Sequence, residues 1–397
     1  MPPAPGRAEG GKTLRTFDIV VTTIFEPDWL GGYLDNIRAH GHTDAVTIRI
    51  IGDRKTPASV YEAAAAAARD GFSIDCPDLD EQERYLRRLG LPDGFIPWNT
   101  DNRRNIGYLR AWEHGADVLI SIDDDNYCRP ESDFIACHSV VSGPAGGGRT
   151  AKLVSGGAWF NICDLLHDDT AQTIYARGFP YNERRAGQDA SIGSLPDELA
   201  QTPVAVNAGL WLDDPDVDAV SRLALRPLVD SAQDSDLILA PGTWSPINTQ
   251  NTALHRDAIP TYYYVRMGFP VQGMLVDRFG DIWSGYFLQR CAQHLGEVAR
   301  VGSPVADHRR TTHNLFKDLY QELAGIVLTE DLVPWLRETP LSGSTYAEAY
   351  ASLADALAQQ ADKFSGFMWD EGGRDFIKAT AGHMQTWLGA IRVLTGT

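Results

Sequence analysis

Residues 118–126 read Val-Leu-Ile-Ser-Ile-Asp-Asp-Asp-Asn, an apolar and largely β-branched run that ends on three consecutive carboxylates. A buried strand of this kind would deliver Asp123, Asp124 and Asp125 to its carboxyl end. Hard divalent cations take oxygen ligands and share them readily with phosphates, so the end of this strand is a candidate site for a cation and a diphosphate. An acidic turn after a strand is the simpler interpretation, because Asp is common in turns.

Strand-like and helix-like patterns alternate in the first part of the chain. Residues 17–23 and 46–51 are apolar runs of strand length, and helical spacing follows them at 29–37 and 57–69. Strands that alternate with helices predict parallel pairing, with ligands bound at the carboxyl ends of the strands. Asp53 follows the second strand and is expected at the same edge as the acidic run. The predicted fold is α/β, a mixed and mainly parallel sheet flanked by helices.

The two ends of the chain depart from this alternation. Residues 1–14 are rich in Pro and Gly and are expected to form a disordered tail. The last part of the chain is helical in pattern, so we expect a C-terminal helical region over 316–397 beside an α/β domain over 15–315. The apolar stripe of the last helix, which carries Met384 and Trp387, is expected to pack on the main domain or on a second copy, and the latter would give a homodimer.

Composition narrows the class of partner. The 397 residues are 43% hydrophobic and carry a formal net charge of −18. An acidic chain is poorly suited to nucleic acid or to an anionic membrane surface. No apolar stretch is long enough to span a bilayer, the N-terminus lacks a hydrophobic signal core, and the five cysteines show no CxxC pair. We therefore expect a cytoplasmic protein whose partner is a small molecule.

Two segments rich in arginine are suited to an anionic ligand. Residues 102–108, Asn-Arg-Arg-Asn-Ile-Gly-Tyr, lead into a helix just before the acidic strand. The candidates there for phosphate or base contacts are Arg103, Arg104 and Asn105. Residues 177–185, Arg-Gly-Phe-Pro-Tyr-Asn-Glu-Arg-Arg, would offer Arg177 to a diphosphate. A solvated helix start and a rigid corner packed on the sheet are the structural alternatives for the two segments.

Two later residues are candidates for chemistry. Asp281 stands among aromatic residues, and burial against Phe279 and Trp283 would suit it to proton transfer or to orienting sugar hydroxyls. Alternatively, Asp281 caps a helix that begins at Ile282. His308 follows a strand-like segment, and a neutral imidazole would complete a carboxylate metal site, although a lone His is more often structural.

The order of these segments resembles the reversibly glycosylated polypeptides, which include the plant UDP-arabinopyranose mutases and related bacterial nucleotide-sugar mutases of actinomycete antibiotic pathways. The segments that carry the resemblance are Arg-Asn-Ile-Gly-Tyr-Leu, Ile-Ser-Ile-Asp-Asp-Asp, Arg-Gly-Phe-Pro-Tyr, Gly-Leu-Trp-Leu with Pro-Asp-Val-Asp-Ala, Asp-Ile-Trp-Ser-Gly and the late His, within residues 17–320. The resemblance implies a glycosyltransferase-A-like fold. It also implies a divalent-metal enzyme that interconverts pyranose and furanose forms of a nucleotide-bound sugar without flavin, and the chain lacks a dinucleotide-binding glycine fingerprint.

The resemblance also implies roles for the candidate residues. The expected ligands of a Mn²⁺ or Mg²⁺ ion are Asp123, Asp125 and His308. The expected contacts of the nucleotide diphosphate are Asp53, Arg103, Arg104, Asn105, Asp123, Asp124 and Arg177. Arg184 matches the arginine that becomes glycosylated in the plant members, and Arg185 competes for that role because the loop is one residue longer here. Asp281 or one of the acids within 213–218 is the expected acid or base.

Departures from the plant pattern fall where the sugar and base would be read, at 182–187, 207–208, 247–251 and 272–280. Together with the bacterial character of the motifs, they favour a GDP-linked hexose or deoxyhexose over a UDP-linked pentose, in secondary-metabolite or glycan-precursor biosynthesis. Three other functions remain open. The protein would be a glycosyltransferase that passes the sugar to an acceptor, a nucleotidyltransferase, or a non-catalytic protein that binds nucleotide sugars.

Overall fold

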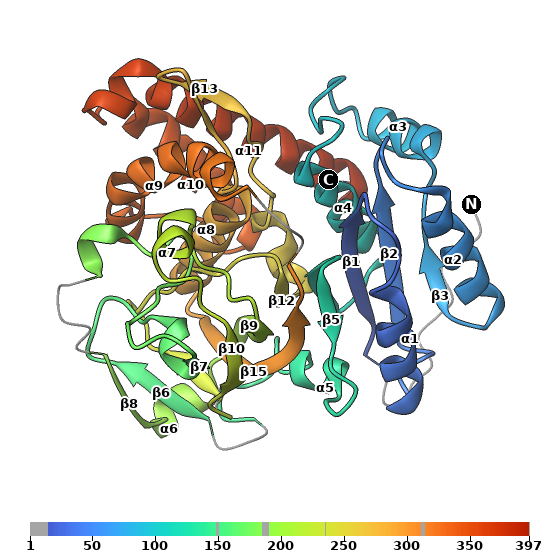
Figure 1. Cartoon of the computed structure of the whole chain (residues 1–397). Helices are drawn as coiled ribbons and strands as arrows, with labels where there is room; N and C mark the ends of the chain where they lie inside the picture. Colours follow the sequence, from blue (N-terminus) through green and yellow to red (C-terminus); the bar gives the residue numbers. More distant parts are fainter. Residues whose placement is uncertain (1–14, 148–150, 185–189, 235, 311–313, 397) are drawn as a thin grey trace.

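The structure is a computed structural model, and it describes residues 15–147, 151–184, 190–234, 236–310 and 314–396 (Figure 1). The predicted disordered tail, residues 1–14, lies outside the described residues, as does Arg185. Within them, one large mixed sheet has the strand order β3-β2-β1-β4-β12-β9-β15-β11-β6-β8 along its main path.

The first part of this sheet is parallel and is covered by helices, as predicted. Its strands are β1 (Phe17–Thr23), β2 (Val46–Gly52), β3 (Ser73–Asp75) and β4 (Val118–Asp123). Its helices are α1 (Leu30–Ala39), α2 (Ala58–Arg69), α3 (Leu79–Arg88) and α4 (Arg104–His114), with the 3-10 helix η1 (Asp101–Arg103) before α4. Most residues of β1, β2 and β4 are buried, which is typical of parallel strands covered on both faces.

The register of these strands fixes the position of the acidic run. Thr22 pairs with Asp123, and Thr23 pairs with Gly52, so the carboxyl ends of β1, β2 and β4 meet at one edge. Helix α4 lies close against this sheet because Gly107 has no side chain: a Cβ there would be 2.3 Å from the Val20 Cγ1 atom.

The middle of the chain adds both parallel and antiparallel strands to the sheet. Its strands are β5 (Asn126–Cys128), β6 (Lys152–Ser155), β7 (Leu166–Asp168), β8 (Ser191–Ser194), β9 (Val204–Asp213), β10 (Val229–Ala232), β11 (Leu237–Leu239), β12 (Asn251–His255) and β15 (Val298–His308). β12 is antiparallel to β4 and β9, whereas β15 is parallel to β9. The three longest pairings, β9 with β15 and β1 with β2 and β4, are parallel, which confirms the predicted mixed, mainly parallel sheet.

Shorter elements connect these strands. They are α5 (Phe134–His138), η2 (Ile162–Leu165), η3 (Tyr181–Glu183), α6 (Asp197–Ala200), α7 (Ala219–Ala224), η4 (Arg256–Thr261) and the hairpin of β13 (Phe269–Val271) and β14 (Met274–Val276). The longer helix α8 (Gly280–His294) follows the hairpin and is almost wholly buried. It therefore forms the centre of the second layer of the molecule.

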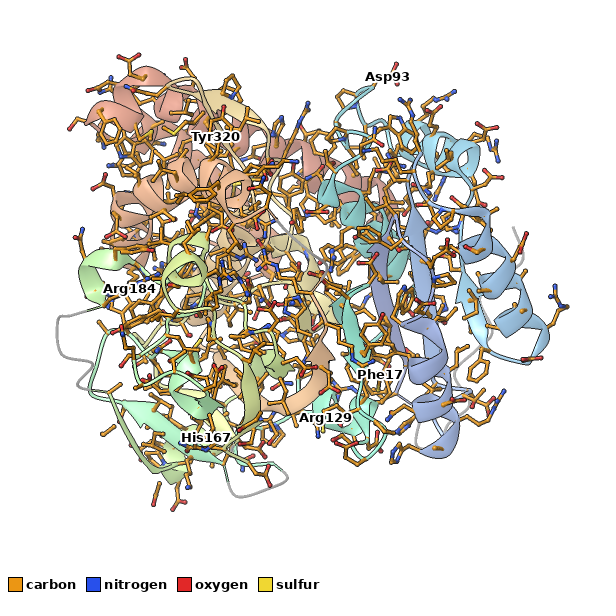
Figure 2. All side chains as sticks on the ribbon, in the orientation of Figure 1. Phe17, Asp93, Arg129, His167, Arg184 and Tyr320 are labelled. Carbon is orange, nitrogen blue, oxygen red and sulfur yellow. The ribbon has the colours of Figure 1, made fainter. Side chains whose placement is uncertain are left out.

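The C-terminal helices α9 (Leu315–Glu338), α10 (Tyr346–Ala361) and α11 (Arg374–Thr395) pack around α8, with the π-helical turn η5 (Trp369–Gly373) before α11 (Figure 1). Side chains fill this layer (Figure 2), and its core is continuous with α4 and the sheet. Met384 and Trp387 have no exposed surface, and the Trp387 indole donates to the Pro260 carbonyl at 2.9 Å.

The stripe of the last helix thus packs on its own chain, so it offers no surface for the homodimer that we considered. The predicted division at residue 315 stays a prediction. The C-terminal helices share one hydrophobic core with α4 and α8. No helix within the described ranges has the length and apolar character that a membrane crossing requires.

Candidate functional site

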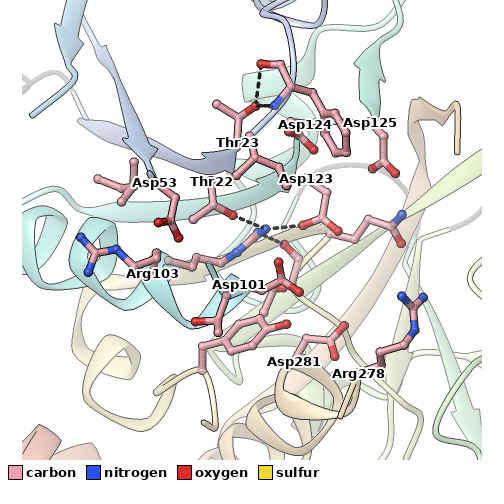
Figure 3. Close-up of a pocket in the computed structure, with 18 of the residues that line it drawn as sticks. Thr22, Thr23, Asp53, Asp101, Arg103, Asp123, Asp124, Asp125, Arg278 and Asp281 are labelled. Atoms are coloured by element: carbon pink, nitrogen blue, oxygen red, sulfur yellow. Dashed lines mark hydrogen bonds and ion pairs between the residues drawn. The ribbon is translucent and has the colours of Figure 1, made fainter. Parts of the chain in front are cut away.

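A pocket of about 320 Å³ opens where the carboxyl ends of β1, β2 and β4 meet (Figure 3). Most of the predicted site residues line it: Asp53, Arg103, Arg104, Asp123, Asp124, Asp125, Arg177, Asp281 and His308. They come from six separate segments of the chain. The parallel topology therefore assembles most of the site that the sequence predicts.

Asp53 and Arg103 form one end of the pocket. The two carboxylate oxygens of Asp53 accept from the backbone N–H groups of Arg54 and Asn99, both at 2.6 Å. The Arg103 guanidinium lies 3.6 Å from the centroid of the Trp98 ring, and burial lowers the pKa of Arg103 to about 10. Asp53 thereby ties the loop that leads into η1 to the end of β2.

Arg104 is a buried anchor beneath the acidic run. Its Nη1 donates to the Ser121 hydroxyl at 2.8 Å and to the carbonyls of Ile122 and Thr249 at 2.8 and 3.1 Å, while Nη2 pairs with Asp123. The guanidinium therefore joins the end of β4 to the segment before β12. Burial opposes the charge of Arg104, but the neighbouring carboxylate more than compensates and its pKa is raised.

Asn105 does not reach the pocket, although we expected it to contact the nucleotide. Its side chain is fully buried, donating to the Tyr264 carbonyl at 2.9 Å and accepting from the Tyr264 N–H at 2.8 Å. The residue after Arg104 on a helix points about 100° away from it, and that direction leads into the core. Asn105 holds Tyr264, whose side chain does line the pocket.

The acidic run carries more negative charge than its surroundings neutralise. Burial, opposed by Arg104 and reinforced by Asp125, raises the pKa of Asp123 to about 6. Burial also raises the pKa of Asp124 to about 7. The neighbouring carboxylates Asp123 and Asp125 add to this increase, whereas a hydrogen bond with Thr23 opposes it. Both shifts mean that the folded protein resists placing a full negative charge on these two side chains.

Asp125 differs because it has a partner in His308. The register of β5 and β15 pairs Asn126 with His308, which brings the imidazole Nε2 to 3.3 Å from the Asp125 carboxylate. Burial acts to raise the pKa of Asp125, but the hydrogen bond and charge of His308 hold it below its ordinary value. The pKa of His308 is raised in return, although burial opposes this.

The predicted metal-binding set is only partly assembled. Among the residues that the structure describes, no three His, Cys, Asp or Glu side chains are grouped to hold a metal ion. Asp123 pairs with Arg104 instead of joining Asp125 and His308. Asp125 and His308 still present one carboxylate and one imidazole side by side, which fits a cation whose other ligands come from phosphates and water.

Arg177 and Asp281 lie at the opposite end of the pocket. Asp281 occupies the second position of α8, so it does not cap a helix that begins at Ile282. Both of its oxygens accept from Arg177, at 3.1 and 2.6 Å, and Arg177 also pairs with Asp216. Desolvation opposes the charge on Arg177, but the two carboxylates raise its pKa well above the ordinary value.

Several lining residues were not assigned by sequence reasoning: Lys55, Asp101, Arg278 and Arg310. Each lies within three residues of a residue that was assigned or of a segment that was singled out. Arg278 adopts the left-handed backbone conformation with φ of 56°, which is uncommon for a long side chain and often marks a functional site. No local sequence pattern reports such a conformation in an arginine.

Arg184 lies outside the pocket, contrary to the placement that the resemblance implied. It follows η3, and its guanidinium pairs with Asp218 at 2.5 Å and stacks 3.6 Å from the centroid of the Tyr181 ring. In Figure 2 it is near the left edge of the molecule. In the described structure, Arg184 is a partly buried ion-pair residue rather than a group that faces the pocket.

An α/β protein with a polar pocket at the carboxyl edge of parallel strands belongs to the broad class that binds small molecules at this edge. The family model of the reversibly glycosylated polypeptides matches residues 17–394. The chain belongs to this family.

Curated relatives include UDP-arabinopyranose mutase 1 of Oryza sativa subsp. japonica, which is 28% identical over 331 residues, covering 80% of each chain. The probable UDP-arabinopyranose mutase 1 of Solanum tuberosum is 29% identical over 300 residues, covering 72% of this chain and 73% of the relative. Among solved structures, glucosyl-3-phosphoglycerate synthase of Mycobacterium tuberculosis with Mn²⁺, UDP-glucose and phosphoglyceric acid matches with a TM-score of 0.39 and 13% identity, covering 86% of this chain and 87% of that one.

Proposed function

We propose that the protein is a nucleotide-sugar mutase, which interconverts the pyranose and furanose forms of a sugar attached to a nucleoside diphosphate. The observation that carries the proposal is one pocket in which an acidic strand end, Asp123–Asp125, faces arginines at the carboxyl edge of a parallel sheet. Membership of the family supports it, as do the names of the plant relatives.

The pocket residues would divide the substrate between two ends. Asp53 and Arg103, beside β2, would contact the nucleoside, and the Arg177–Asp281 pair would face the sugar. On the wall of the pocket, Lys55 is exposed and Arg278 is partly exposed. They would stabilise the negative charge that develops when the bond between C1 and the diphosphate breaks.

A divalent cation, Mn²⁺ or Mg²⁺, is part of the proposal. Asp125 and His308 would hold it together with the phosphates, and Asp123 and Asp124 would lie close by. When bound, such an ion would neutralise charge on the diphosphate. The raised pKa values of Asp123 and Asp124 support a counter-ion here, because each marks a carboxylate with too little positive charge around it. No flavin is invoked.

The choice of substrate follows the relatives. They are plant proteins named for UDP-arabinopyranose, so we propose a UDP-linked pentose as the first substrate to test. The GDP-linked hexose or deoxyhexose that the motif departures favour is the second. None of the relatives described above supports a bacterial antibiotic pathway.

The test is incubation of the protein with UDP-arabinopyranose and, separately, with GDP-linked hexoses and deoxyhexoses, each with Mn²⁺ or with a chelator. A product of unchanged mass and shifted retention time is expected, and it should disappear in chelator. Release of free nucleoside diphosphate on adding an acceptor would indicate a glycosyltransferase, and binding without conversion would indicate a non-catalytic protein.

The metal assignment needs matched variants. Asp125→Asn and His308→Ala should each lower turnover at limiting Mn²⁺ by at least roughly tenfold, with partial recovery at higher Mn²⁺. Asp93→Asn is the control, because Asp93 is an exposed acid far along the chain from this pair and outside the pocket lining. Full activity of the two variants at limiting Mn²⁺ would contradict the assignment.

A further inference from the structure

We propose that Asp101 is a catalytic residue that carries a proton between two oxygens of the sugar, an inference that rests on the proposed mutase function. Asp101 lines the pocket and is exposed to solvent. Figure 3 shows it between Asp53 at one end and Asp281 at the other. It therefore lies between the residues assigned to the nucleoside and those assigned to the sugar.

The backbone around Asp101 is held in place by its neighbours. Asn99 donates its N–H to Asp53 at 2.6 Å, and Asn102 donates its side chain to the Tyr264 carbonyl at 2.7 Å. Asp101 is also the first residue of η1, so its φ and ψ are set by the helix that follows. A group fixed in this way can be aimed at a substrate without ordering on binding.

The carboxylate of Asp101 makes no hydrogen bond or ion pair with any other residue that the structure describes. The other carboxylates of the pocket all have partners. These pairs are Asp53 with two backbone N–H groups, Asp123 with Arg104, Asp124 with Thr23, Asp125 with His308, and Asp216 and Asp281 with Arg177. A general base needs an oxygen that is not already committed to a cation, and Asp101 is the lining acid that meets this requirement.

The surroundings of Asp101 suit a base that acts on a sugar. Asp101 interacts electrostatically with Arg104, Asp123 and the phenol of Tyr264, which places it near the end of β4 and the wall below the sugar end.

One carboxylate is enough for the ring contraction. The pair of electrons of the C1–O bond leaves with the diphosphate, and the ring oxygen O5 stabilises the positive charge at C1. Asp101 then takes the proton of the O4 hydroxyl while O4 forms a bond to C1. Next, Asp101 returns this proton to O5 as the C1–O5 bond breaks. The diphosphate oxygen adds back to C1, so atoms, protons and electrons balance without an oxidant or a protein-sugar bond.

This order of steps separates bond cleavage at C1, which does not need Asp101, from ring contraction, which does. The test uses UDP-arabinopyranose with ¹⁸O in the bridge between C1 and the β-phosphorus. Cleavage and return without contraction move the label into the non-bridging positions of that phosphate. The wild-type protein should scramble the label and also form the furanose.

Asp101→Asn should bind UDP and scramble the label like the wild-type protein, and should lose furanose formation by about 10²-fold or more. Asp93→Asn, an exposed acid outside the pocket, should retain both activities. Furanose formation by Asp101→Asn within about threefold of wild type would overturn the inference. Loss of scrambling together with furanose formation would also overturn it, because Asp101 would then act in cleavage or binding.

Two further results keep the inference distinct from its premise. Added formate should restore furanose formation to Asp101→Ala, since a small carboxylate can replace the missing base. If Asp101→Ala binds UDP and scrambles the label but formate does not restore furanose formation, the inference is wrong. A wild-type protein that neither scrambles the label nor forms a furanose with UDP-arabinopyranose or with the GDP-linked hexoses and deoxyhexoses would overturn the proposed function itself, and this inference with it.

Discussion

Arg177 and Asp281 are joined by two hydrogen bonds, 3.1 Å from Nη1 to Oδ1 and 2.6 Å from Nη2 to Oδ2. Arg177 also donates to both oxygens of Asp216, at 2.8 and 3.0 Å. One buried guanidinium thus links the loop after β9 to the first turn of α8. Because a buried charge without a partner is costly, this arrangement holds both carboxylates in place at the end of the pocket opposite Asp53.

Asp281→Ala should therefore lower the free energy of unfolding by about 2–4 kcal/mol, since it leaves the buried Arg177 with only one carboxylate. Asp281→Asn keeps an acceptor oxygen and the side-chain volume, so its cost should be about half as large. Urea denaturation at pH 7 measures both, with Asp93→Asn as the surface control. Equal stability of Asp281→Ala and wild type would show that the ion pair does not support the fold.

Asp124 gives a prediction about pH. The pKa of its carboxyl is 3.8 when unperturbed and about 7 in the folded protein. Between these values the folded state binds more protons than the unfolded state, so this group lowers stability as pH rises from 4 to 7, and the loss is complete above pH 7.

Asp124→Asn removes the ionisation. In chelator, the variant should be more stable than wild type by about 1–3 kcal/mol at pH 8 and no more stable at pH 4. The difference at pH 8 is smaller than the full pKa shift would give, because the side chain is partly exposed to solvent. Thermal or urea unfolding at the two pH values measures the difference. A gain of the same size at both values would mean that the effect is packing rather than charge.

The sequence predicts the pocket well because its signals are local. The alternation of strands and helices implies parallel strands, and parallel strands bring their carboxyl ends to one edge whatever the rest of the fold does. Asp53 and Asp123 could therefore be placed together from two separate runs, and the register of β1 with β2 and β4 confirms the arrangement.

The rest depends on partners that a single sequence does not identify. Nothing in the acidic run shows that Asp123 pairs with Arg104. The direction of the Asn105 side chain depends on how α4 is rotated about its axis, which the sequence does not give. An apolar stripe such as that of α11 could pack on its own chain or on a second copy, and the sequence does not decide between the two. Asp101 could not be singled out from the sequence, because its lack of a partner is visible only in the assembled pocket.

Arg184 gives the last prediction. Its guanidinium pairs with Asp218, which also accepts the Ser221 N–H at 2.8 Å and so caps α7. The Asp218 carboxylate is buried, so Arg184→Met should lower the free energy of unfolding by about 2–4 kcal/mol by leaving Asp218 without a cation. Asp218→Asn should be destabilising as well, and the double variant should cost less than the sum of the two, because the second substitution removes a charge that the first has left unpaired. Urea denaturation of the four proteins gives this coupling energy.

The furanose yield per folded molecule should be retained in Arg184→Met, since Arg184 does not line the pocket. A fully folded Arg184→Met that loses the furanose product, with no coupling to Asp218, would instead place Arg184 at the sugar, in a conformation other than the one described here.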